Sequence, residues 1–223
     1  MAPYRIIAVD GLGGSGKGTL ARMIASYFKY NLLDSGAIYR VLGMYFLRKK
    51  ISLTNTTVIR DLVSQLKIFF EIKSYRTITY LDNVDITKEI RREKVGMTAS
   101  KIATSRYIRT LLINKQYEFS KMGLGLVADG RDMGTVVFPD AKHKFFLKAN
   151  VEIRAKRRFL QLLSENCTPR FKTVLNLLKK RDKNDCTRKM APSCPSKDAI
   201  IIDTTNLNPK DVFELVLKSI EGH

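Results

Sequence analysis

A glycine-rich stretch near the start of the chain, GLGGSGKGT, carries a single lysine and follows a short apolar run. Its spacing is GxxxxGK, from Gly11 to Lys17, between a run that predicts a strand and a segment that predicts a helix. Glycines let successive backbone N–H groups turn toward phosphate oxygens, and the following helix adds its positive N-terminal end. We therefore predict a loop that binds the phosphates of a nucleoside triphosphate. Its residues are Gly11, Leu12, Gly13, Gly14, Ser15, Gly16, Lys17, Gly18 and Thr19.

The lysine of this loop can reach the β- and γ-phosphates as a point charge. Ser or Thr is common directly after such a lysine, whereas this chain has Gly18 and then Thr19, so we expect the magnesium-binding hydroxyl one position later. A glycine-rich turn without a ligand is the alternative, and the spacing, the context and the lysine disfavour it. GTPases, ATPases, helicases and small-molecule kinases all use such loops, so residues further along the chain must decide its use.

A second polar motif, ADGRDMGT, ends another apolar run. Asp129 falls at the carboxyl end of a predicted strand, where a carboxylate can hold water around Mg²⁺ beside a phosphate loop. Arg131 and Asp132 follow at the same edge of the sheet. An ordinary polar turn is the alternative, because Asp-Gly is a common turn pair.

Two further motifs place arginines near predicted helices. In LLDSGAIYR, Ser35 is a residue type that caps helices, Tyr39 lies one turn in, and Arg40 could bind a second phosphate. In the segment KKRDKNDCTRKMAP, residues Arg181, Asp185 and Arg188 recur at intervals of four and three, which is one helix face. That face is either solvated or part of a mobile lid that brings arginines to a transferring phosphoryl group.

The order of apolar runs predicts how these motifs are brought together. Short strands are expected over 4–10, in NLLDSG, and over 125–130, 144–149 and 198–204, with helices between them, which indicates a doubly wound, parallel α/β sheet. Runs over 67–72 and 76–81 predict a small antiparallel insert. Helices are expected over 17–28, 37–47, 54–66, 88–103, 107–122, 151–164 and 209–220, and over 171–181 before a loop-like charged stretch.

The composition is that of an ordinary globular protein, but the net charge is +19. This charge fits a nucleic-acid partner, a pocket for a polyanionic small molecule, or solvated helix faces rich in lysine. Three loosely spaced cysteines, Cys167, Cys186 and Cys194, predict neither a disulfide framework nor a metal site. The first residues do not resemble a signal peptide and no run could span a bilayer, so we expect a soluble cytoplasmic protein that does not bind membranes.

Taken together, the motifs GLGGSGKGT, LLDSGAIYR, ADGRDMGTVVFPDA and the RDxxDxxR segment resemble those of the bacterial cytidylate (CMP) kinases, in order and through nearly the whole chain. This resemblance implies a P-loop nucleoside monophosphate kinase fold: a five-stranded parallel sheet flanked by helices, a small antiparallel monophosphate-binding insert and a short lid. It implies a core of roughly 1–60, 105–165 and 195–223, an insert of roughly 61–104 and a lid of roughly 166–194.

The resemblance also implies the reaction and its residues. ATP would phosphorylate CMP and dCMP with Mg²⁺, and UMP would be a poorer acceptor. Lys17, Arg131 and Arg188 would be catalytic, and Asp129 (through water) and Thr19 would hold the metal. The residues expected to bind the acceptor are Ser35, Tyr39, Arg40, Ser100, Arg109, Arg131, Asp132, Arg181, Asp185 and Arg188. Of these, Ser35, Arg109 and Asp132 would read the cytosine, while Ser100, Arg181 and Asp185 would contact the sugar.

Two other functions stay open on the sequence alone. A kinase for UMP, or for both UMP and CMP, would carry the same loop, although a carboxylate at Asp132 suits the amino group of cytosine, which uracil lacks. A nucleic-acid-binding phosphate-loop protein would fit the charge, but the basic residues are scattered and no aromatic-basic motif of the RNA-binding type is present. We expect a monomer with nucleotides as its partners and no nucleic acid.

Overall fold

The computed structural model describes residues 5–165 and 167–222, and its centre is a parallel sheet. The strands lie in the order β2-β6-β1-β7-β8 and every neighbouring pair is parallel. Their bounds are β1 Ile6–Gly11, β2 Asn31–Asp34, β6 Leu126–Gly130, β7 His143–Lys148 and β8 Ile200–Asp203. The predicted α/β class with a five-stranded parallel sheet is confirmed. Tyr4, the first residue of the first predicted strand, lies outside the described residues.

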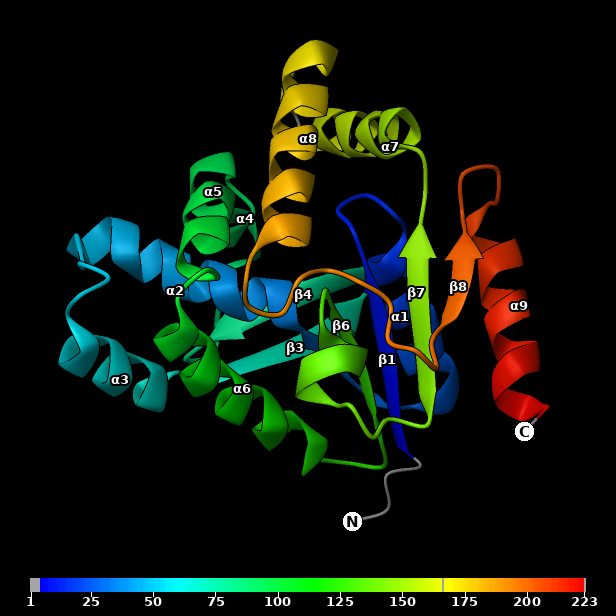
Figure 1. Ribbon diagram of the computed structural model, residues 1–223, viewed down its shortest axis with the longest axis horizontal. Helices are drawn as coiled ribbons and strands as arrows, with labels where there is room; N and C mark the ends of the chain where they lie inside the picture. The colour runs from blue at the N-terminus through cyan, green and yellow to red at the C-terminus, as the bar shows by residue number, and fades with distance from the viewer. Residues whose placement is uncertain (1–4, 166, 223) are drawn as a thin grey trace.

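Helices cover both faces of this sheet (Figure 1). The helices are α1 Lys17–Phe28, α2 Ser35–Lys49, α3 Thr56–Gln65, α4 Thr87–Ile90, α5 Glu93–Ile102, α6 Arg106–Ser120, α7 Val151–Ser164, α8 Phe171–Thr187 and α9 Pro209–Glu221, with a short π-helix, η2, at Met133–Val137. Two apolar cores result. One packs α1 and α9 against the sheet through residues such as Ile24 and Val216, and the other packs α2 and α6 through residues such as Ile38 and Leu112.

A separate antiparallel sheet lies between the helices of the second core, as the pattern of apolar residues predicted. It consists of β3 Ile68–Lys73, β4 Arg76–Leu81 and β5 Val84–Asp85. The turn between β3 and β4 has positive φ at Ser74 and Tyr75, and its register is fixed by the pairing of Lys73 with Arg76. The assignment of this insert to monophosphate binding stays a prediction.

Three local predictions were wrong. The helix expected over 88–103 is broken at Arg91 and Arg92 into α4 and α5. The helix expected to end at 181 continues to Thr187, because Asp185 and the arginines around it are held by partners rather than by water. Ser35 does not cap α2. Asp34 is the N-cap, its Oδ1 accepts the N–H of Ala37 at 2.9 Å, and Ser35 is the first helical residue.

The polar motifs meet at one edge of the main sheet. Parallel strands place their carboxyl ends on the same side, so Gly11, Asp34 and Gly130 end neighbouring strands there, and α7 and α8 lie beyond that edge in Figure 1. In open α/β sheets this edge is where ligands bind. Across residues 5–165 and 167–222, none of the helices has the length and apolar character that a membrane crossing requires.

Candidate active site

The predicted phosphate loop joins β1 to α1. Gly14 and Gly16 have φ of 79° and 96°, in the left-handed region that glycine adopts without strain. A β-carbon on Gly14 would also lie 2.8 Å from the backbone oxygen of Arg154. Gly16 is the N-cap of α1 and supplies no side chain to its first N–H groups. The N–H of Thr19 already donates to the backbone oxygen of Gly16 at 3.0 Å, so an anion would use the N–H groups before it, at the end of the helix where the dipole favours an anion.

Lys17 lies at the start of α1, and its Nζ is 3.7 Å from Oδ1 of Asp129 at the end of β6. Burial, followed by repulsion from Arg131, lowers the pKa of Lys17 to about 8. Burial raises the pKa of Asp129 to about 6 despite the attraction of Lys17. Both charges are thus held out of water at some cost, which is typical of a site that binds charged ligands.

Gly18 lets α1 approach Asp129 closely. A β-carbon at this position would lie 2.9 Å from Oδ2 of Asp129, so a serine or threonine directly after the lysine would have to displace this carboxylate or α1. The hydroxyl of Thr19, the next residue, accepts a hydrogen bond from Nη2 of Arg22 at 3.1 Å. The displacement of the hydroxyl by one position therefore has a steric reason.

Two cations that the sequence reasoning missed support the loop. Arg22 lies three residues after Thr19, a helical spacing that could have pointed to it. Arg154 on α7 is buried, donates to the backbone oxygens of Gly13 at 3.0 Å and Ala149 at 2.9 Å, and pairs with Asp182 on α8 at 2.7 Å. No pattern in the sequence distinguishes Arg154 from the other basic residues of its helix.

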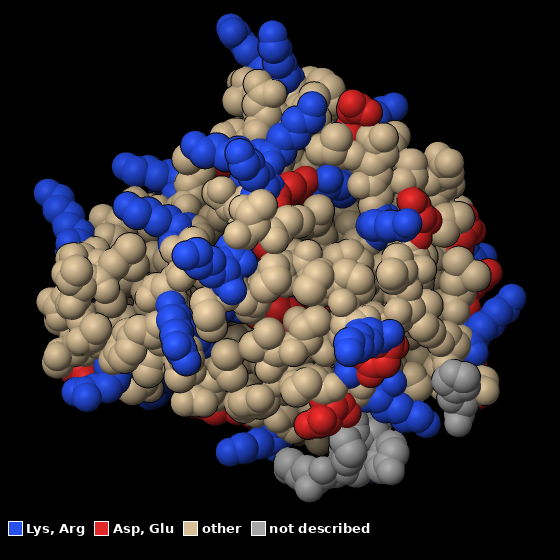
Figure 2. Space-filling model, in the orientation of Figure 1, with Lys and Arg blue, Asp and Glu red and all other residues tan. Residues whose placement is uncertain are grey.

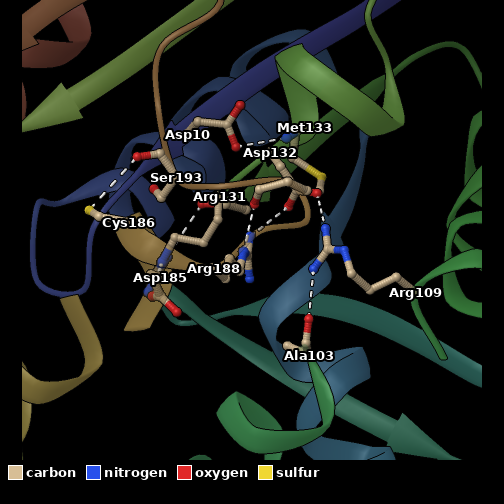
Figure 3. A network of polar contacts seen from close by, with 12 residues as sticks. Asp10, Ala103, Arg109, Arg131, Asp132, Met133, Asp185, Cys186, Arg188 and Ser193 are labelled. Carbon is tan, nitrogen blue, oxygen red and sulfur yellow. Dashed lines mark hydrogen bonds and ion pairs between the residues drawn. The ribbon is translucent and has the colours of Figure 1, made fainter. Parts of the chain in front are cut away.

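Further along this edge of the sheet, Asp132 lies between two arginines (Figure 3). Nη2 of Arg109 on α6 donates to Oδ2 of Asp132, and Nη2 of Arg188 is 3.6 Å from its Oδ1. Burial raises the pKa of Asp132 although both arginines oppose this shift. The guanidinium of Arg109 also lies 5.8 Å from the ring centre of Tyr39 on α2. The structure thus brings together four residues from different parts of the chain: Tyr39, Arg109, Asp132 and Arg188.

A second ion pair joins the residue after β6 to α8. Nε of Arg131 donates to Oδ2 of Asp185 at 2.9 Å. Burial alone would lower the pKa of Arg131, but Asp185, together with Asp129 and Asp182, outweighs burial, and the pKa is raised. Arg181, one turn earlier on α8, lies near both and its pKa is lowered by burial and then by Arg131.

Arg40 lies on α2, where this helix packs against α5. Its Nη1 donates to the backbone oxygen of Ile90 at 2.9 Å. A β-carbon on Gly96 would lie 2.9 Å from the guanidinium nitrogens, so this glycine makes the room for Arg40. Burial and then Arg181 and Arg158 lower the pKa of Arg40 to about 10. Arg158, on α7, is a further cation that the sequence reasoning did not single out.

Several buried polar atoms around the cleft have no hydrogen-bond partner among the described residues. They include the hydroxyls of Tyr39 and Ser100, Oδ1 of Asp129, Nε of Arg181 and Nη2 of Arg188. Buried polar atoms without partners cost free energy unless a ligand satisfies them. Together with the mutually repelling arginines, they indicate a site for a polar anion. Ser35 is buried at the start of α2, and its predicted contact with a base stays a prediction.

The positive charge is not confined to the cleft. Figure 2 shows Lys and Arg side chains over much of the visible face, most densely over the half that holds α2, α5 and α8. Many belong to solvated helix faces, such as Lys49 and Lys50 at the end of α2. The cysteines are unpaired and exposed at Cys167, Cys186 and Cys194.

Comparison with known proteins agrees with this geometry. The family model described as cytidylate kinase matches residues 7–222. The cytidylate kinase of Vibrio cholerae is 41% identical over 217 residues, which are 97% of this chain and 96% of that protein. That of Acinetobacter baylyi is 42% identical over 97% of this chain and 96% of its own, and cytidylate kinase 1 of Haemophilus influenzae is 43% identical over 97% and 93%. The chain belongs to the cytidylate kinase family.

Proposed function

We propose that this protein transfers the γ-phosphoryl group of ATP to CMP and dCMP, giving ADP with CDP or dCDP. An oxygen of the acceptor phosphate attacks the γ-phosphorus while the bond to the departing ADP oxygen breaks. The observation that carries the proposal is the convergence of Lys17, Arg131, Arg181, Arg40 and Arg188 on one cleft beside a carboxylate suited to cytosine. Such a cluster repels itself until anions bind.

ATP binds at the loop from Gly11 to Thr19 in this proposal. The free N–H groups at the start of α1 hold its phosphates, and Lys17 neutralises the β- and γ-oxygens. Thr204 supports the loop, because its hydroxyl donates to the backbone oxygen of Ser15 at 2.8 Å. The loop is thereby fixed to the end of β8.

Mg²⁺ fits the residues beside the loop. Asp129 has a buried oxygen without a hydrogen-bond partner, and hard carboxylate and hydroxyl oxygens are ligands that Mg²⁺ prefers. Asp129 would hold the ion through water and Thr19 would add a hydroxyl. When bound, the ion neutralises charge that develops on the transferred phosphoryl group.

The acceptor phosphate lies against Arg40, Arg131 and Arg188. Phosphoryl transfer has a loose transition state, so catalysis depends on positioning and positive charge more than on a strong base. Arg131 is oriented by Asp185 and Arg188 by the backbone oxygen of Ala191 at 2.6 Å. Preorganised guanidinium groups in a cleft with little water stabilise charge more than groups that must reorient.

In this proposal, Asp132, Arg109 and Ser35 bind the base and distinguish cytosine from uracil. A carboxylate at Asp132 accepts from the exocyclic amino group of cytosine, whereas uracil places a carbonyl there and leaves buried groups unpaired. Tyr39 packs beside Arg109 and helps to hold its guanidinium. The sugar lies near Ser100, Arg181 and Asp185. Since both ribose and deoxyribose carry a 3′-hydroxyl, dCMP is included as an acceptor.

We propose that the protein acts as a monomer. The test of the proposed function is ADP release with ATP and Mg²⁺, with CMP, dCMP, UMP and AMP offered separately. We expect CMP and dCMP to give rates well above UMP and AMP. Equal rates with CMP and UMP would contradict the cytosine assignment, and no stimulation by any monophosphate would contradict the kinase.

A further inference from the structure

Asp10 is a buried carboxylate at the carboxyl end of β1, directly before the phosphate loop. Its Oδ1 accepts the N–H of Met133 at 2.9 Å and its Oδ2 accepts the N–H of Gly134 at 2.8 Å. Met133 and Gly134 are the first two residues of η2. A side chain on one strand therefore caps a helical turn that follows a different strand, as Figure 3 shows.

The residue that would ordinarily cap this turn is Asp132. It occupies the N-cap position of η2 but makes no capping hydrogen bond. Aspartate is among the preferred N-cap residues, and its side chain usually accepts an N–H of the first turn. Here the Asp132 carboxylate faces Arg109 and Arg188 instead.

We propose that Asp10 is a positioning residue for base recognition: by capping η2 from β1, it lets the Asp132 carboxylate turn away from the backbone, toward Arg109, Arg188 and the pyrimidine of the substrate. This inference rests on the proposed function of Asp132. Without Asp10, the N–H groups of Met133 and Gly134 lose their acceptors inside the protein. The side chain at the N-cap position is then the acceptor that capping geometry favours, and turning toward the backbone draws it away from the base.

An alternative role for Asp10 makes a different prediction. Because Asp10 directly precedes Gly11, its sole role in this alternative would be to hold the phosphate loop in place. Its loss would then weaken ATP binding and leave the preference for CMP over UMP unchanged. The ratio of kcat/KM for CMP to that for UMP therefore separates the two roles, since both substrates use the same donor site.

The experiment compares Asp10→Asn, Asp132→Ala and the double variant with the unmodified protein. Asparagine keeps the size of the side chain but replaces one accepting oxygen with an NH₂ group, which cannot accept an N–H. We expect the CMP/UMP ratio of Asp10→Asn to fall about tenfold, with the Kd for ATP within about threefold. The double variant should have the ratio of Asp132→Ala alone, because Asp10 acts through Asp132.

Asn55→Ala is the matched control, because Asn55 caps α3 by accepting the N–H of Val58 far from the cleft. It should lower stability without changing the CMP/UMP ratio. If Asp10→Asn does not fold, Asp10→Glu replaces it, and the displaced carboxylate should also lower the ratio.

Two results would overturn the role of Asp10. One is an unchanged ratio in a folded Asp10 variant while Asp132→Ala lowers it. The other is a double variant whose losses are additive. An unchanged ratio in Asp132→Ala itself would instead overturn the proposed function of that residue.

Discussion

The proposed donor side of the site is one continuous stretch, Gly11 to Thr19, which offers backbone N–H groups and the side chain of Lys17. The proposed acceptor side takes its side chains from α2, α5, α6, α8 and the end of β6, so residues from Ser35 to Arg188 must meet. The donor side is thus specified locally by glycine and one lysine. The acceptor side exists only when the whole chain has folded.

This difference has an energetic counterpart. On the donor side the glycines adopt their conformation without strain, and one cation, Lys17, is held at a cost, since burial lowers its pKa to about 8. On the acceptor side, burial and neighbouring charges shift the pKa of Arg40, Arg181 and Arg188 downward, so the cations are held at a cost. Charged side chains that the fold holds close together despite their repulsion are expected to provide substrate selectivity and to stabilise the transition state.

The largest effect is expected from Arg131→Ala, at the junction of the two sides. Removing a guanidinium that stabilises the transferred phosphoryl group should lower kcat by roughly 10³-fold, the scale of arginines in this chemistry. Steady-state ADP release with CMP measures the change. Arg60→Ala, at an exposed arginine of α3, is the control and should keep full activity. A loss confined to the KM for CMP would assign Arg131 to ground-state binding instead.

A smaller effect on the acceptor side is expected from Asp132→Ala. This change removes the proposed cytosine acceptor and leaves Arg109 buried without its carboxylate. The kcat/KM for CMP should fall by roughly 10²-fold and that for UMP much less, so the preference for CMP shrinks. Rates measured with both acceptors at saturating ATP give the ratio. Equal losses with CMP and UMP would show that Asp132 has only a structural role.

Gly18→Ala tests the donor side alone. The added methyl group meets Oδ2 of Asp129 at 2.9 Å and must push the helix or the carboxylate away. Overpacking of this kind costs about 1–3 kcal/mol, so ATP should bind about tenfold more weakly in the presence of Mg²⁺. CMP binding, measured without ATP by calorimetry, should be unchanged. Ser26→Ala, on the exposed part of α1, is the control, and an equal loss of CMP affinity would contradict the separation of the two sides.

The smallest effect is expected from Ser100→Ala. The Ser100 hydroxyl is buried without a hydrogen-bond partner in the described chain, so its removal should not lower the melting temperature. If it donates to the sugar of the acceptor, the KM for CMP should rise about threefold to tenfold. Thr98→Ala, on the exposed side of the same helix, should leave the KM unchanged. A lower melting temperature with an unchanged KM would remove Ser100 from the acceptor site.

The same contrast explains what could be predicted from the sequence. The sheet and the phosphate loop follow from apolar runs and from glycine spacing, which are local. Asp10 and Arg154 could not be assigned, because their partners Met133 and Gly13 are far away in the sequence and are brought close only by packing. Arg22 is different, because Thr19 lies three residues before it on α1, a local spacing that the sequence reasoning overlooked. The predicted end of α8 was also wrong. The charged residues after 181 had suggested a loop, but in the structure they form ion pairs with residues of other elements.

The measurement that tests the two-sided site most directly is calorimetric binding of ATP and of CMP, each alone, to Lys17→Ala and Asp132→Ala. We expect Lys17→Ala to weaken ATP by about tenfold or more and CMP by less than about threefold, with the reverse pattern for Asp132→Ala. Both ligands weakened equally by both variants would contradict separate donor and acceptor sides.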